Sequence, residues 1–336
     1  MTIRMTLLMF SISLSFVCHF SAHAQIPLTD NATVVFATAD EARRILTSRD
    51  DFVQRMSPFD RAARMKTDQA VSEAQYLAFV GQNVLDWSDA EREKLTAVLA
   101  AIGPRLAEFK LPLPATIHLV RTTGREEGGA FYTRGAAIMF PTRQLASGDA
   151  ELRRIVCHEL FHVLSRAQPE LKEALYATIG FEQCGEVEWP AELADRRITN
   201  PDAPVNDHAI ELQIAGKQQW AIPIIYSKSP QYDVRRRGEF FQYLEFRFLA
   251  VERDAAGVAT RIYEDGKPVL AEPADVAGFY EQIGRNTEYI IHPEEVLADN
   301  FSLLVLGETN VKTPEVLRKM ETALREHAAD GPAPGN

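Results

Sequence analysis

The apolar residues in the first third of the chain recur at the three- to four-residue spacing of helices. This pattern runs from about residue 36 to residue 110. One helix start is marked by Ser88, which is followed three positions later by Glu91 and so forms a capping box. We therefore predict an N-terminal helical region over residues 25–112.

Two strands and a buried helix are predicted next. Residues 115–122 (ATIHLVRT) and 129–141 (GAFYTRGAAIMFP) are typical of strands. In residues 153–166 (RRIVCHELFHVLSR) apolar side chains cover most of a helical circumference, which indicates a helix buried on nearly all sides. These elements predict a core region over residues 113–204, with its second strand at the edge of a sheet.

The pattern changes again in the second half of the chain. Residues 205–272 contain several stretches typical of strands, and Asp265 followed by Gly266 is typical of a tight hairpin turn. Helical spacing returns over residues 273–328, before a polar tail at 329–336 that we expect to be frayed. The chain therefore predicts an α+β protein with a small mixed sheet, a helical N-terminal layer and a β-rich insertion.

The N-terminus has the organisation of a secretory signal peptide. Within residues 1–24, Arg4 is followed by an apolar run to Phe20 and by the small-x-small sequence AHA. The apolar run is short for a bilayer span. We therefore expect cleavage after Ala24, no stable membrane insertion of the mature chain, and a periplasmic or secreted protein.

Charge and cysteine content restrict the partners and the redox chemistry. A formal net charge of -11 disfavours nucleic acid as a partner. Cleavage of the signal peptide would leave two cysteines, Cys157 and Cys184. In an oxidising compartment they can form one disulfide, but Cys157 lies in the predicted buried helix, where a core thiol is the alternative. The spacing leaves both alternatives open.

The predicted buried helix carries three polar side chains, which are costly there unless something satisfies them. His158 and His162 are four residues apart, so on a helix both lie on one face, one turn apart. Two neutral imidazoles in this arrangement can chelate one zinc ion. Glu159 lies about 100° around the helix, where it can take a proton from zinc-bound water without ligating the metal. The motif therefore predicts Zn²⁺ as the cofactor and Glu159 as the catalytic base.

A catalytic zinc ion usually has a third protein ligand. Residues 292–300 (HPEEVLADN) are the best candidate segment, because Pro293 suits a first helical position and Glu295 and Asp299 lie one turn apart. Glu295 would bind the zinc ion, and Asp299 would accept the free N–H of a ligand histidine. Glu182 is the alternative third ligand, because it follows the motif at an interval common in short zinc peptidases.

With HELFH and the later Glu-x-x-x-Asp helix, the chain resembles the gluzincin zinc metallopeptidases. The resemblance covers the region from about residue 115 to 165 together with residues 292–307. It implies a zincin-like catalytic core with an edge strand beside the zinc helix, a water-promoting glutamate, and hydrolysis of peptide bonds. The chain departs from the family in the long interval before Glu295, and in Glu294, where some members carry asparagine. Carried across by motif, the zinc ligands are His158, His162 and Glu295, the base is Glu159, and Asp299 orients a ligand histidine.

The expected substrate is a peptide or protein that pairs with the edge strand through main-chain hydrogen bonds. His208, Tyr226 and Tyr232 are candidates for stabilising the oxyanion, and the sequence does not choose among them. Two other functions stay open: a non-catalytic envelope protein with a binding or structural role, and a zinc hydrolase of a non-peptide amide. A protein that needs only the metal has no use for an unligated carboxylate at Glu159, which favours an enzyme.

Overall fold

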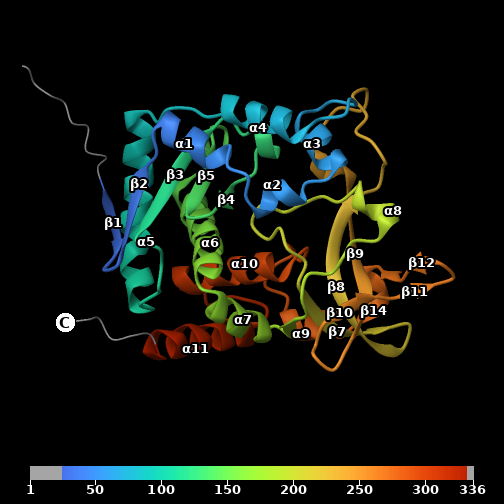
Figure 1. The fold of residues 1–336 in the computed structure, drawn as a ribbon. Helices are drawn as coiled ribbons and strands as arrows, with labels where there is room; N and C mark the ends of the chain where they lie inside the picture. Colours follow the sequence, from blue (N-terminus) through green and yellow to red (C-terminus); the bar gives the residue numbers. More distant parts are fainter. Residues whose placement is uncertain (1–24, 331–336) are drawn as a thin grey trace, which may run out of the picture.

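The computed structural model describes residues 25–330, which form two large sheets, a two-stranded sheet and the helices around them (Figure 1). The predicted signal peptide at 1–24 lies outside the described residues, as does the tail from residue 331 onward. Within residues 25–330, no helix combines the length and the apolar character needed to cross a membrane. The fold is α+β, with a mixed five-stranded sheet and a curled antiparallel sheet.

The five-stranded sheet contains the N-terminal strands and the strands that precede the motif helix. Its order is β1-β2-β3-β5-β4, in which the three inner strands are parallel and the two edge strands are antiparallel to their neighbours. The strands are β1 (Ile26–Thr29), β2 (Ala32–Phe36), β3 (Thr116–Thr122), β4 (Tyr132–Arg134) and β5 (Ala137–Pro141).

Two predictions about this sheet were wrong in detail. Residues 26–36 fall within the region predicted as helical, yet they form β1 and β2, because residues 33–36 pair in parallel with β3. Residues 129–141 form two strands rather than one, because Gly135 has a φ of 58° and lies in the turn between β4 and β5. Of the segment predicted as one edge strand, only the short β4 lies at an edge of the sheet, and β1 forms the opposite edge.

Helices cover both faces of this sheet, as the alternation of side chains along its strands requires. Leu119 and Ile138 pack with α5 and α6, whereas their neighbours Val120 and Met139 pack with α1 to α4 on the other face. These helices are α1 (Ala39–Leu46), α2 (Asp51–Arg55), α3 (Pro58–Arg64), α4 (Glu73–Gln82), α5 (Asp89–Glu108) and α6 (Asp149–Ala167).

The predicted β-rich block supplies most of the curled antiparallel sheet. Its main path is β10-β9-β8-β7-β14, while β6 and β13 pair with β7 and β9. Asp265 and Gly266 both have positive φ (49° and 75°) in the turn between β11 and β12, which confirms the predicted hairpin. β14 lies just outside residues 205–272, whereas β6 comes from the region predicted as the core, residues 113–204. The strands of this sheet are β6 (Phe181–Gln183), β7 (His208–Ile214), β8 (Lys217–Ser227), β9 (Leu244–Arg253), β10 (Ala259–Arg261), β13 (Leu270–Ala271) and β14 (Val276–Ala277). β11 (Tyr263–Glu264) and β12 (Lys267–Pro268) form a separate two-stranded sheet.

The remaining helices connect the two sheets and close the core on the side of α6. In Figure 1, α10 lies beside α6, and α11 lies along α7 at the bottom of the molecule. These helices are α7 (Pro169–Ala177), α8 (Ala191–Ala194), α9 (Phe279–Ile283), α10 (Pro293–Leu306) and α11 (Pro314–Asp330).

The two cysteines of the described chain are free thiols rather than a disulfide. Cys157 belongs to the core beneath the five-stranded sheet, and Cys184 belongs to the core of the curled sheet. Burial raises the pKa of Cys157 to about 12 and that of Cys184 to about 11. Both thiols therefore stay protonated at neutral pH and are poor nucleophiles.

A buried ion network joins the N-terminal helices to the chain that leads into the β-rich block. Arg64 on α3 donates to Asp60 at 2.6 Å and to the two carboxylate oxygens of Glu127 at 2.8 and 2.5 Å. It also donates to the carbonyl of Thr199, whose amide in turn donates to Asp60. This network fixes the start of residues 199–205, a segment that we call the strap.

We predict that Arg64→Met lowers the free energy of unfolding by about 3–5 kcal/mol, because it leaves Asp60 and Glu127 unpaired in the interior. Urea denaturation of the purified protein measures the change. Arg49→Met, which removes an exposed ion pair with Glu73, is the matched control and has a much smaller effect. Equal effects of the two substitutions would contradict a stabilising role for the buried network.

Candidate metal centre

The motif helix α6 and the helix α10 pack against each other at the centre of the core (Figure 1). The boundaries of α10 follow from its sequence. His292 is the N-cap, Pro293 is the first helical residue, and Gly307 ends the helix with a φ of 72°. Where the two helices pack together, the histidines of α6 face the acidic residues of α10 rather than water.

Three side chains from these two helices converge on one point. Nε2 of His158 lies 3.1 Å from Oε2 of Glu295, and Nε2 of His162 lies 3.5 Å from the same oxygen. A tetrahedral zinc ion with bonds of about 2.0–2.1 Å holds its donor atoms about 3.3–3.4 Å apart. The two measured distances bracket this value, so the three side chains can hold a metal ion.

The surroundings of the His162 imidazole also favour a metal ion at this point. Its Nε2 is buried and has no hydrogen-bond partner among residues 25–330. A buried polar atom without a partner is costly, and a cation at the point of convergence would remove that cost. Imidazole and carboxylate donors suit zinc and several other divalent transition metals. The group therefore fits a divalent cation without identifying it.

The other ring nitrogens are held by two further carboxylates of α10. Nδ1 of His158 lies 3.1 Å from Oδ1 of Asp299, and Nδ1 of His162 lies 3.0 Å from Oε1 of Glu294. An N–H donated from each Nδ1 leaves the lone pair of Nε2 facing the centre. Glu294, which the sequence marked only as a departure from the family pattern, is thus the counterpart of Asp299.

The carboxylates and imidazoles shift one another's ionisation. Burial alone would lower the pKa of His158, but its hydrogen bonds with Asp299 and Glu295 outweigh burial and raise the pKa to about 9. The pKa of His162 is raised well above its ordinary value, because the charges of Asp202 and Glu295 likewise outweigh burial. Burial would raise the pKa of Glu295, but the two imidazoles hold it well below its ordinary value. Without a metal ion, the centre is a set of ion pairs.

Glu159 lies beside the three donors without being one of them. Glu159 is only 4% exposed, and its Oε2 has no hydrogen-bond partner in the described part of the chain. Ligand atoms of Glu159, His162 and Asp202 lie within 4.8 Å of one another and form a second group that could hold a metal ion. Burial, together with the negative charge of Asp202, raises the pKa of Glu159 to about 8. Its carboxylate can therefore exchange a proton near neutral pH, next to the metal position.

The alternative third ligand, Glu182, does not lie at this centre. It is on β6, and its largely exposed carboxylate pairs with Arg253 at 2.7 Å. Glu182 therefore belongs to a strand of the curled sheet and is not a donor at this centre.

The three oxyanion candidates lie in other environments. Nε2 of His208 lies 3.0 Å from the carboxylate of Glu173, and the hydroxyl of Tyr232 donates to the carbonyl of Gly238. Tyr226 is paired within the β8–β9 ladder. Among the described residues, His208 is not part of the group of donors around Glu295, and the contacts of the two tyrosines lie in and beside the curled sheet.

Two neighbours of the centre carry no sequence signal. The ring of Tyr289 stacks on that of His158, with centroids 6.3 Å apart and an interplanar angle of 18°, while the residue is 42% exposed. A tyrosine hydroxyl is protonated at neutral pH, so that of Tyr289 can donate a hydrogen bond. Nδ2 of Asn200 donates to Oε1 of Glu295 at 2.5 Å. Both residues lie in loops that only the tertiary fold brings here.

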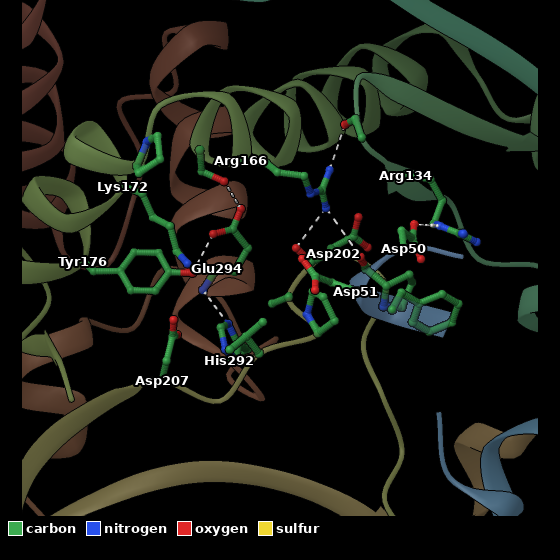
Figure 2. A pocket seen from close by; sticks show the side chains of 18 of the residues that line it. Asp50, Asp51, Arg134, Arg166, Lys172, Tyr176, Asp202, Asp207, His292 and Glu294 are labelled. Atoms are coloured by element: carbon green, nitrogen blue, oxygen red, sulfur yellow. Dashed lines mark hydrogen bonds and ion pairs between the residues drawn. The ribbon is translucent and has the colours of Figure 1, made fainter. Parts of the chain in front are cut away.

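Two pockets open beside the centre. The polar one has a volume of about 360 Å³, and in Figure 2 Tyr176, Glu294 and His292 lie on one side of it and Asp202 lies on the other. The apolar one adjoins Asp202 and Tyr289 and is lined mainly by aromatic and branched side chains. These are Phe131, Ile198, Ile225, Phe240, Phe241, Leu244 and Ile291.

Comparisons of the chain with protein-family models, with curated proteins and with solved structures find no match. The fold and the site define the class of protein: it is an α+β protein with a buried His-His-Glu group that can hold a metal ion.

We predict that Glu294→Gln and Asp299→Asn each weaken zinc binding about 10–100-fold, because each removes a charge that orients a ligand imidazole. His158→Ala and Glu295→Ala, which remove ligands, should abolish tight binding. Competition with a chromogenic chelator measures all four affinities. Glu182→Gln is the control and should bind zinc like the wild type. Zinc binding that survives Glu295→Ala but is lost in Glu182→Gln would reverse the assignment.

Proposed function

We propose that the protein is a periplasmic or secreted zinc-dependent peptidase in which Glu159 is the general base. The observation that carries the proposal is a buried carboxylate beside three metal donors that does not join them. Catalytic zinc sites have three protein ligands and keep a fourth position for water or substrate, whereas structural sites are closed by four. A metal kept only for folding would not require Glu159 in this position.

The surroundings of the site support a peptide as the substrate. The gluzincin resemblance implies a zincin-like core with an edge strand beside the zinc helix, and β4 is an edge strand that packs against α6. Extended peptides bind edge strands through main-chain hydrogen bonds, which gives orientation with little sequence preference. The apolar pocket next to Tyr289 has a volume of about 40 Å³, which suits a small apolar group of the substrate.

The roles of the residues follow from their contacts. A bound zinc ion would polarise the scissile carbonyl and lower the pKa of a water molecule. Glu159 takes a proton from the attacking water and passes it to the leaving amine nitrogen. Asp299 and Glu294 keep the two imidazoles in one tautomer and one orientation. Tyr289, still protonated, donates a hydrogen bond to the carbonyl oxygen as negative charge develops there.

We predict that Glu159→Gln keeps bound zinc but lowers peptide hydrolysis at least about 100-fold, because the amide cannot accept the proton. Mass spectrometry of a diverse peptide mixture incubated with the protein measures cleavage, and elemental analysis measures the metal. A chelator should abolish wild-type cleavage. Cleavage of simple non-peptide amides without any cleavage of peptides would favour the alternative hydrolase. If the zinc-loaded wild type hydrolyses neither peptides nor simple amides, a binding or structural role is favoured.

We predict that Tyr289→Phe lowers kcat about 10²–10³-fold, because one donor to the oxyanion is lost. Its KM and zinc content should change little, since the ring still stacks on His158. Steady-state kinetics on a peptide identified in the mixture measures both constants. Tyr232→Phe is the matched control and should retain the wild-type kcat. A Tyr289→Phe protein with unchanged kcat would remove Tyr289 from the mechanism.

A further inference from the structure

A second group of possible metal donors lies beside the first. Its members are Glu159, His162 and Asp202, whose ligand atoms lie within 4.8 Å of one another. We call these residues the second group, and we call His158, His162 and Glu295 the first group, which meets the same limit. The two groups share His162 and no other residue. The centre therefore offers two overlapping positions for a cation.

His162 can serve only one of the two positions at a time. Its Nδ1 lies 3.0 Å from Oε1 of Glu294, to which it donates a hydrogen bond when Nε2 is free to bind a metal. Nε2 then has one lone pair, which binds one cation. A cation that uses the second group therefore takes a ligand away from the first group.

The second group is largely buried and lacks partners within the protein. Oε2 of Glu159 and Nε2 of His162 are both buried, and neither atom has a hydrogen-bond partner in the described part of the chain. The carboxylates of Glu159 and Asp202 lie close enough to repel each other in a site from which most water is excluded. A cation between them would remove this repulsion and satisfy the two unpartnered atoms.

Asp202 is held in one position by the fold. Its Oδ1 accepts hydrogen bonds from the amide of Thr133 at 2.7 Å and from the hydroxyl of Thr133 at 2.6 Å. Arg166 of α6 donates to the carbonyls of Pro201 and Asp202 (Figure 2). Because both hydrogen bonds from Thr133 go to Oδ1, the lone pairs of Oδ2 remain available to a cation. The second group is thus in place before any cation binds.

The two groups differ in the donors that they offer. The first group has two imidazoles and one carboxylate, whereas the second group has one imidazole and two carboxylates. Imidazole suits zinc, copper, iron and nickel, while carboxylate suits magnesium, calcium and manganese. Of the cations that prefer oxygen donors, Mn²⁺ is the transition metal and accepts an imidazole most readily. The donor set of the second group therefore favours Mn²⁺.

We propose that the second group is a second cation site with a preference for Mn²⁺, and that its occupation competes with zinc binding to the first group. In the manganese-loaded protein Glu159 is a metal ligand and is no longer a free base. The resulting loss of hydrolysis is the one consequence that rests on the proposed function. The site itself can be tested without a substrate.

Anomalous X-ray scattering from crystals of the wild type locates each cation, because zinc and manganese absorb at different energies. One crystal is soaked with zinc alone and another with manganese alone. We expect zinc among the donors of the first group and manganese among the donors of the second group. Manganese bound only at the first group would overturn the proposal, as would a protein that binds no manganese.

Two variants test the same assignment in solution, where competition with a chelator measures the affinities for zinc and for manganese. His158→Ala removes a donor of the first group only, and Asp202→Asn removes a donor of the second group only. Loss of a negative charge near the centre weakens both divalent cations alike, so the informative quantity is the ratio of the two affinities. Asp195→Asn, which changes an exposed carboxylate shortly before the strap, is the control.

His158→Ala should weaken zinc binding at least about tenfold more than manganese binding, and Asp202→Asn should do the reverse. Asp195→Asn should change neither affinity. Equal losses for both cations in Asp202→Asn would show an effect of charge alone and overturn the proposal. Peptide hydrolysis by the manganese-loaded protein at the rate of the zinc-loaded protein would also overturn it. Manganese in the second group of a protein that cleaves no peptide would uphold the site and refute the peptidase.

Discussion

The contact between two imidazoles on α6 and three carboxylates on α10 determines the organisation of this protein. Each imidazole uses Nδ1 for one carboxylate and turns Nε2 towards the shared Glu295. None of these groups is tolerated in a core alone, because an unpaired buried charge is far more costly than any single apolar contact is favourable. The two helices must therefore pack in one register, and the rest of the core is arranged around that register.

The chain supplies this contact from positions that are far apart in sequence. Between α6 and α10 it forms α7, the strap and the curled sheet, and only then returns to the core. The helix dipole stabilises the two carboxylates at the start of α10, because Glu294 and Glu295 lie in its first turn, where negative charge is favoured. The strap is fixed at Thr199 by a network that belongs to the N-terminal helices. Remote parts of the chain thus meet at one small site.

The sequence predicted what local periodicity determines. The placement of His158 and His162 on one face follows from the helical repeat, and the boundaries of α10 follow from Pro293 and Gly307. The strands β1 and β2 were missed because their pairing with β3 is a tertiary event that short apolar stretches do not reveal. The same limit applies to Asn200, Asp202 and Tyr289, since loop residues reach the centre only through the path of the folded chain.

Glu294 shows a different limit of sequence reasoning. An acidic residue in the first turn of a helix has an adequate local explanation in the helix dipole. Its contacts with Nδ1 of His162, the hydroxyl of Ser165 and the hydroxyl of Tyr176 become visible only when α6 and α7 are placed against α10. The helix dipole therefore explains only part of why an acidic residue stands at position 294.

The charges at the centre explain how the same arrangement can exist with and without a metal ion. Without a metal ion, the carboxylates around the two imidazoles raise the pKa of both. A divalent cation at the Nε2 atoms competes with protons there, so metal binding displaces protons from the imidazoles. In either state positive charge faces the carboxylates of α10, which favours the same packing of α6 against α10. The packing of α6 against α10 therefore preforms the group of donors, and the two helices need not move to accept a cation.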